Sequence, residues 1–148
     1  MIRAALTLLV ALPIALGAQP SSAGDRFDGT FRKYSKRFFG PDHDWRLFKA
    51  QAMAGSNLDP AARSHVGARG VMQLMPSTFG EIQSKNPDMR SIDDAEWNIA
   101  AGIAYDRTLW RLWERDTVET DRHEFMFASY NAGERRIPLL DHRGVMEF

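Results

Sequence analysis

Hydrophobic residues along most of this chain recur at the spacing of helical faces. Four aromatic residues fall at i, i+4, i+7 and i+11: Phe27, Phe31, Tyr34 and Phe38. This spacing predicts one face of an amphipathic helix, which the Gly-Pro pair at 40–41 ends. We therefore expect residues 24–43 to form an N-terminal aromatic helix and a linker.

A second helix is expected after Asp44, whose carboxylate suits the N-cap position. Its apolar pattern runs from Trp45 to about Ala54. The run Gly-Ser-Asn at 55–57 is typical of a helix stop, because glycine tolerates the left-handed backbone that follows a last turn.

Loop signals dominate the stretch from Ser56 to Pro76. Pro60, Gly67 and Gly70 within it exclude one continuous helix. Proline is favoured at the first position of a helix, so a short helix is expected to begin at Pro76 and continue through Ile82.

Two capping boxes predict the last two helices. In the first, Asp93 is the cap and Glu96 stands at the third helical position, and the helix continues to about Arg115. The second box begins at Asp121, and Gly133 ends the helix that follows. With no strand pattern and no internal repeat in the sequence, we predict an all-α fold.

Three details of these helices carry expectations about packing. Gly102 is expected to permit the close approach of a neighbouring helix. His123 is expected on the surface, in the first turn of the last helix. That helix is expected to carry Phe125, Ala128 and Ala132 on one side.

Composition favours a single globular domain without a nucleic-acid partner. The 148 residues suit one core, and 44% are hydrophobic against 26% charged. Lys and Arg number 19, as do Asp and Glu, so the basic excess typical of nucleic-acid binding is missing. The lack of cysteine excludes disulfides and thiolate metal sites. Asp42-His43-Asp44 indicates a turn and cap rather than a metal site, and we expect no cofactor.

Residues 1–23 have the form of a secretory signal peptide. Arg3 gives a positive start, Ala4 to Leu16 is an uncharged apolar run, and Ser-Ser-Ala at 21–23 is a small-residue cleavage pattern. The run is shorter than the roughly 20 residues of a membrane-spanning helix and is interrupted by Pro13, so a buried or anchoring helix is the weaker interpretation. We expect export to the periplasm or cell envelope.

Several short motifs occur in a fixed order between Trp45 and Gly133. The loop-rich stretch contains Ser56, Asp59-Pro60, Ser64, Gly67-Ala68, Gly70-Val71-Met72-Gln73 and Met75-Pro76. The last two helices contain Asn98-Ile99, Gly102 and Ser129-Tyr130-Asn131-Ala132-Gly133. In this order the motifs resemble the catalytic domain of the soluble-lytic-transglycosylase (SLT) family, which cleaves the glycan strands of bacterial peptidoglycan. The resemblance implies a lysozyme-like helical domain over residues 44–137, with peptidoglycan glycan strands as its partner.

The resemblance also implies one catalytic carboxylic acid, a Glu that directly precedes Ser56. In the family this acid protonates the glycosidic oxygen and then serves as base while the sugar's 6-hydroxyl closes a 1,6-anhydro ring, unlike the carboxylate pair of ordinary glycoside hydrolysis. Gly55 occupies the position here. Loss of a general acid typically lowers the rate about 10²–10⁴-fold. Asp59, Glu81 and Glu96 are not expected to replace it, because they lie in a turn or on helices.

Six further positions are candidate substrate-binding residues: Ser56, Ser64, Met72, Gln73, Tyr130 and Asn131. Gln73 is the best candidate for a hydrogen bond to substrate, the alternative being that its amide ties the loop backbone. By resemblance Tyr130 would orient the catalytic carboxylate, and otherwise it is a core residue at a helix end. The two serines suit turns as well as sugar contacts, and Met72 suits packing.

The end of the chain also departs from the family pattern. Further helices usually follow the Tyr-Asn motif, whereas residues 138–148 match no family motif. A C-terminal truncation or frameshift, or a specialised non-catalytic descendant, explains both this departure and Gly55. Two hypotheses follow: a working transglycosylase, and a non-catalytic protein that binds peptidoglycan or a cell-envelope protein partner. The order of the motifs argues against a third, an unrelated helical module.

Overall fold

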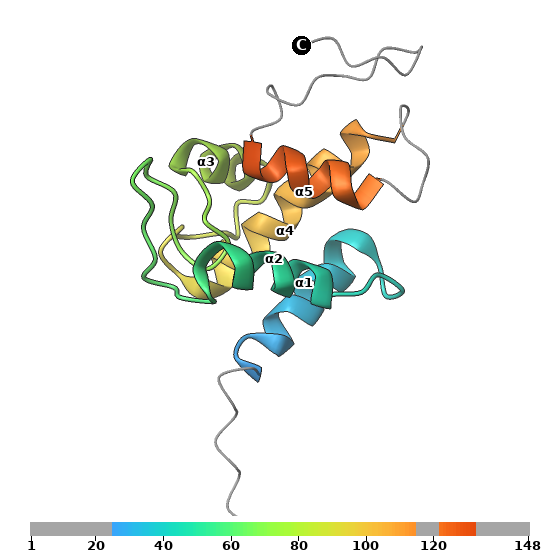
Figure 1. Ribbon diagram of the computed structural model, residues 1–148, viewed down its shortest axis with the longest axis horizontal. Helices are drawn as coiled ribbons and strands as arrows, with labels where there is room; N and C mark the ends of the chain where they lie inside the picture. The colour runs from blue at the N-terminus through green and yellow to red at the C-terminus, as the bar shows by residue number, and fades with distance from the viewer. Residues whose placement is uncertain (1–24, 115–121, 133–148) are drawn as a thin grey trace, which may run out of the picture.

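The computed structural model describes residues 25–114 and 122–132 (Figure 1). The predicted signal peptide, Asp121, the stop at Gly133 and the tail after residue 138 lie outside these ranges. The described part forms helices without strands, as predicted: α1 Asp28–Phe39, α2 Arg46–Ser56, α3 Pro76–Lys85, α4 Ala95–Leu112 and α5 Arg122–Ala132. None of these helices is both long and apolar enough to cross a membrane.

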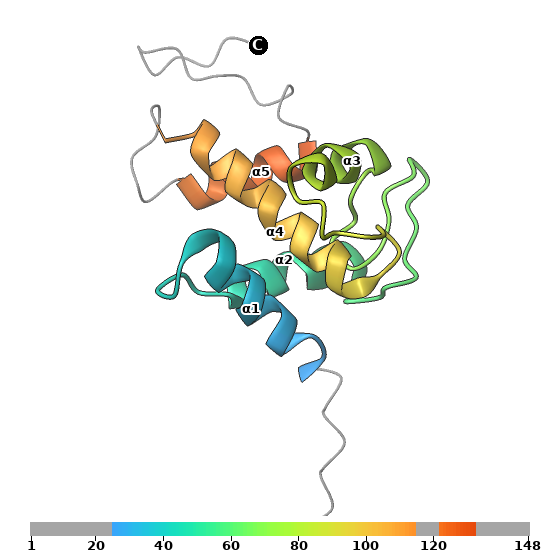
Figure 2. The same ribbon diagram turned by 180° about the vertical axis from the view of Figure 1, so that it is seen from behind.

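Helix α4 is the centre of the fold. Figure 2 shows it running diagonally between α1 and α2 on one side and α3 and α5 on the other, and α1, α3 and α5 all pack against it. Its residues Ile99 and Ile103 are fully buried in the core. The loop between α2 and α3 adds Val71 and Leu74 to that core, so the loop is part of the packed interior.

Helix α1 packs into the same core through the predicted aromatic face. Phe31 and Tyr34 are buried there. The Tyr34 hydroxyl donates to Glu96 Oε1 at 3.0 Å, and Lys33 Nζ donates to the same oxygen at 2.7 Å. Glu96 therefore joins α1 to α4 and does not close a capping box. The predicted cap was wrong by one residue, because Asp94 accepts the hydrogen bond from the Trp97 backbone N–H.

Helix α2 begins one residue later than predicted, at Arg46 with Trp45 as its cap, and it also ends later. Asp44 Oδ1 accepts a hydrogen bond from the backbone N–H of Arg46 at 3.0 Å. The predicted stop at Gly55 was wrong, because the helix continues through Gly55 and Ser56. Asn57 adopts the left-handed conformation, with φ of 53°. Asparagine is the other residue that commonly fills this position.

Two predictions about packing, at Gly102 and on the last helix, need correction. The close neighbour of Gly102 is the Met72 side chain from the loop, not another helix. Helix α5 buries Met126 and Ser129, while Ala128 and Ala132 are exposed. The buried hydroxyl of Ser129 is satisfied by a hydrogen bond that it accepts from the indole of Trp113 at 3.0 Å.

His123 is partly buried rather than on the surface. Its ring lies 4.5 Å from that of Trp110 and 5.2 Å from that of His43, measured between centroids. The contact joins the start of α5 to α4 and to the linker between α1 and α2. Local periodicity could not reveal it, because the three residues come from separate segments.

Candidate active site

The loop between α2 and α3 is anchored by the side chain of Asn98, which is 1% exposed on α4. Its Oδ1 accepts from the Met72 N–H at 2.8 Å, and its Nδ2 donates to the carbonyls of Arg69 and Ile92 at 3.0 and 2.9 Å. Gly70 passes close by with φ of 75°, and a Cβ atom there would lie 2.5 Å from Asn98 Nδ2. Only glycine suits this position, for backbone and for space.

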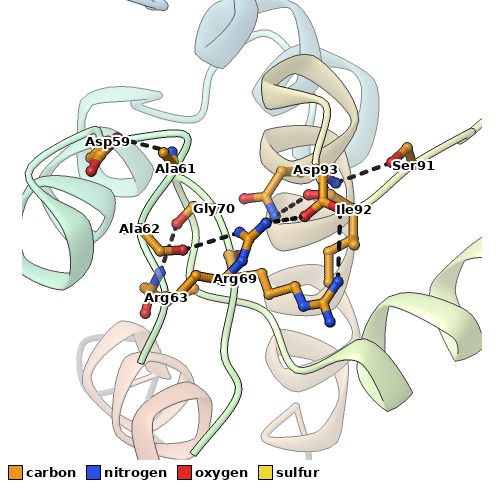
Figure 3. Close-up of polar contacts among 11 residues, drawn as sticks. Asp59, Ala61, Ala62, Arg63, Arg69, Gly70, Ser91, Ile92 and Asp93 are labelled. Atoms are coloured by element: carbon orange, nitrogen blue, oxygen red, sulfur yellow. Dashed lines mark hydrogen bonds and ion pairs between the residues drawn. The ribbon is translucent and has the colours of Figure 1, made fainter. Parts of the chain in front are cut away.

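A surface ion-pair cluster holds the outer part of the loop. Arg63 Nη2 lies 2.7 Å from Asp93 Oδ1, and Arg69 Nη1 lies 3.7 Å from Asp93 Oδ2. Figure 3 shows both arginines converging on Asp93 at the start of α4. Arg69 and Leu74 exchange backbone hydrogen bonds of 2.8 and 3.0 Å, which close the turn that presents Gln73.

Gln73 occupies the tip of this turn with φ of 51°. Its Nε2 donates to the Gly70 carbonyl at 2.9 Å, so the amide ties the loop backbone. The same side chain lines a cavity of about 390 Å³ together with Val66, Met75, Tyr105 and Tyr130. The two roles proposed for Gln73 are therefore compatible, because its fixed amide still borders open space.

Tyr130 lies across this cavity, near the end of α5. Its hydroxyl donates to the Met72 carbonyl at 2.9 Å. Burial raises the pKa of Tyr130 well above its usual value, and the neighbouring Asp106 and Tyr105 raise it further. The phenol is therefore a neutral hydrogen-bond donor that joins α5 to the loop.

Position 55 lies near the end of α2, beside Gln73. Gly55 is exposed, and a Cβ atom there would lie 3.8 Å from Gln73 Cγ, an ordinary van der Waals contact. It lines a second cavity, of about 480 Å³, together with Gln51, Leu47, Phe127 and Asn131. Asn131 lines both cavities, and Gly55 of the second lies beside Gln73 of the first, so the two cavities adjoin and together are called the groove below.

The other three predicted site residues support the loop. Ser56 Oγ donates to the Val71 carbonyl at 2.6 Å, and Ser64 Oγ accepts from the Ala68 N–H at 3.0 Å. Met72 is 3% exposed and packs against Gly102. None of the three lines either cavity. No cluster of metal-ligand side chains occurs within residues 25–114 and 122–132.

One acidic residue next to this region was not predicted from the sequence. Asp106 is fully buried on α4, and its Oδ1 accepts from Gln51 Nε2 at 3.3 Å. Burial raises the pKa of Asp106 well above its usual value, and the bond from Gln51 only partly opposes this. The helical spacing from Ile99 and Ile103 places Asp106 on their buried face, and this signal could have found it.

Comparison with known proteins places the chain in a family. The model of the transglycosylase SLT domain matches residues 31–138. This chain belongs to the SLT transglycosylase family. The SLT match begins within α1 and includes both cavities, so the aromatic helix and the groove lie in the matched part.

Three relatives share the name membrane-bound lytic murein transglycosylase F. The protein from Desulfosudis oleivorans is 39% identical over 93 residues, which is 61% of this chain and 19% of the relative. The protein from Shewanella woodyi is 34% identical over 108 residues, which is 72% of this chain and 22% of the relative. The protein from Erwinia tasmaniensis is 35% identical over 117 residues, which is 79% of this chain and 21% of the relative. The chain thus spans about a fifth of the length of these relatives.

Proposed function

We propose that this SLT domain binds peptidoglycan glycan strands in the groove between Gly55, Gln73, Tyr130 and Asn131, and that it cleaves them poorly or not at all. The observation that carries the proposal is the position of Gly55. It stands beside Gln73 with room for a side chain, where the family resemblance implies the catalytic acid. The groove thus offers hydrogen-bonding side chains and space, but no proton donor at that point.

The cavity linings support the second half of the proposal. Neither lining contains an Asp or Glu side chain among the described residues. Cleavage of a glycosidic bond needs an acid within hydrogen-bond reach of the leaving oxygen. A strand in this groove would be held without being protonated, and the expected rate deficit is at least about 10²–10⁴-fold.

The place of action follows from the same proposal. The relatives are named as membrane-bound murein transglycosylases, and residues 1–23 of this chain have the pattern of a secretory signal. Both observations favour the periplasm or cell envelope, where peptidoglycan is found.

The proposal is tested with purified mature protein and isolated sacculi. Co-sedimentation measures binding, and mass spectrometry of the supernatant measures 1,6-anhydro-muropeptides. We expect binding with little or no anhydro product. Abundant anhydro product that is lost on changing Tyr130→Phe or Gln73→Ala, and absent from a mock preparation, would overturn the inactive assignment.

Restoring the acid gives a second test. Because a Cβ atom at position 55 meets only an ordinary contact, Gly55→Glu should fold and release anhydro-muropeptides. Gly55→Gln is the matched control, since it has the same size and no acid. A folded Gly55→Glu protein no more active than Gly55→Gln would show that the groove lacks more than its acid.

A further inference from the structure

Asp106 is a buried acid without a cationic partner among the described residues. It is 0% exposed, and within residues 25–114 and 122–132 its side chain accepts a single hydrogen bond, from the Gln51 amide. Asp106 Oδ2 and Gln51 Oε1 are both buried and have no hydrogen-bond partner in this part of the chain. An isolated buried carboxylate is costly, and a group in this position remains protonated instead. The neutral acid then supplies an O–H donor beside two oxygens that otherwise only accept.

The acid lies where the two helices of the groove approach α4. Gln51 stands one helical turn before Gly55 on α2, and both line the larger cavity. On the other side, Asp106 is near enough to Tyr130 of α5 to act on its ionisation. Asn131, next to Tyr130, lines the same cavity as Gln51. Asp106 therefore contacts Gln51 of α2 on one side and acts on Tyr130 of α5 on the other.

We propose that Asp106 is a positioning residue of the groove: its carboxylic acid holds the side chain of Gln51 and thereby fixes α2 against α4 and α5. The proposal rests on glycan binding in the groove, described above. The acid is buried and does not line the cavity, so it acts through Gln51 and not on the ligand.

A dependence on pH follows. Among the described residues, the groups that act on Asp106 are neutral: Gln51 from α2 and Tyr130 from α5. An ionised Asp106 would therefore be buried with only the Gln51 hydrogen bond to compensate it, and water would be drawn between α2 and α4. Glycan binding should be strongest where the acid is neutral and should weaken as the pH rises through the raised pKa of Asp106.

Two variants separate positioning from simple packing. Asp106→Asn keeps the shape, the neutral state and an oxygen for Gln51, whereas Asp106→Leu keeps the approximate size and removes the hydrogen bond. Asp88→Asn, at an exposed acid in the loop after α3, is the matched control. Sacculus co-sedimentation from pH 4 to pH 9 gives the apparent dissociation constant, and thermal melting confirms folding.

We expect Asp106→Asn to bind as tightly as wild type at acidic pH and to lose the weakening of binding as the pH rises. Asp106→Leu should fold and bind about 2- to 10-fold more weakly, the range that corresponds to one hydrogen bond. Asp88→Asn should follow wild type throughout. A wild-type pH profile in Asp106→Asn, or wild-type binding by a folded Asp106→Leu, would overturn the proposal.

A readout that needs no glycan separates this inference from the proposed function. The side-chain amide signals of Gln51 in NMR should move with pH in wild type and stay constant in Asp106→Asn. If wild type binds no sacculi at any pH, the proposed function fails, and the Gln51 signals still decide the positioning. Gln51 signals that do not respond to pH in wild type would overturn it.

Discussion

The two sides of the groove are held in different ways. On the loop side, Asn98 uses both amide atoms for backbone groups, and Ser56, Ser64 and Gln73 also bond to the backbone. On the helix side, α2, α5 and the linker before α2 approach α4. Five buried polar atoms there have no hydrogen-bond partner among the described residues: His43 Nε2, Gln51 Oε1, Asp106 Oδ2, Arg107 Nε and His123 Nε2.

The contrast explains how this domain keeps its groove without the acid at position 55. The loop is fixed by bonds to α4 and by Gly70, and none of these involves residue 55. The helix side depends on packing and on Asp106, His43 and His123, whose neutral forms are favoured by burial, so conditions that charge these three groups should loosen it first.

The largest effect is expected on the loop side. Asn98→Ala leaves three backbone groups without their partner, of which the Met72 N–H is buried and the Arg69 and Ile92 carbonyls are partly buried, and an unsatisfied buried group costs about 1–3 kcal/mol. We expect the free energy of unfolding, from urea denaturation, to fall by about 3 kcal/mol or more. Asn86→Ala, which removes one bond to the Ile82 carbonyl, is the control. A loss at Asn98 no larger than at Asn86 would refute the anchoring role.

A smaller loss is expected where the loop meets α4. A Cβ atom at Gly102 would lie 2.6 Å from Met72 Cγ and 2.7 Å from its Cβ, so Gly102→Ala overpacks the core. Overpacking costs about 1–3 kcal/mol, against about 1 kcal/mol that alanine gains over glycine in a helix. Urea denaturation should show a net loss of about 1 kcal/mol. Unchanged stability would mean that Met72 moves aside freely.

The same substitution on the helix side should have the opposite sign. Gly55 is helical and exposed, and its Cβ would make only an ordinary contact. Gly55→Ala should therefore raise the free energy of unfolding by about 0.5–1 kcal/mol. The measurement is the same urea denaturation as for Gly102→Ala. Destabilisation by Gly55→Ala would show that position 55 needs glycine for structural reasons.

The smallest expected effect is the pH dependence of folding stability that comes from the two histidines near the start of α5. Burial lowers the pKa of His43 and of His123. The pKa of His43 is lowered further by His123 and Arg107, with Asp44 opposing, and the pKa of His123 is lowered further by Arg122. The unfolded chain then binds protons that the folded chain does not, so stability is full above about pH 6.5 and decreases as the pH falls below it. The two histidines therefore lower the melting temperature on the acidic side between pH 5 and pH 8, against a slope of opposite sign from the raised pKa of Asp106.

His123→Phe should flatten the slope from the histidines, because it keeps the ring contact and removes one titrating group. The exposed His65→Gln serves as control and should leave the slope unchanged. An unaltered slope in His123→Phe would place the acid sensitivity elsewhere in the molecule.

The helices were predictable because their signals are local. Periodicity predicted the existence of α1 to α5, and Pro76 predicted the start of α3. The errors occurred where neighbouring residues compete for one role. Asp94 caps α4 in place of Asp93, which pairs with Arg63 and Arg69, and Asn57 ends α2 in place of Gly55.

By itself the sequence determined the helical class, the order of the motifs and the glycine at position 55. Only the tertiary structure decided which motif residues border open space: Gln73, Tyr130 and Asn131 line the groove, whereas Ser56, Ser64 and Met72 support the loop. It also revealed Asp106, whose protonation depends on burial between α4 and its neighbours. Burial and hydrogen-bond partners arise between segments that are far apart in the chain, and the pattern of one segment does not specify which other segments pack against it.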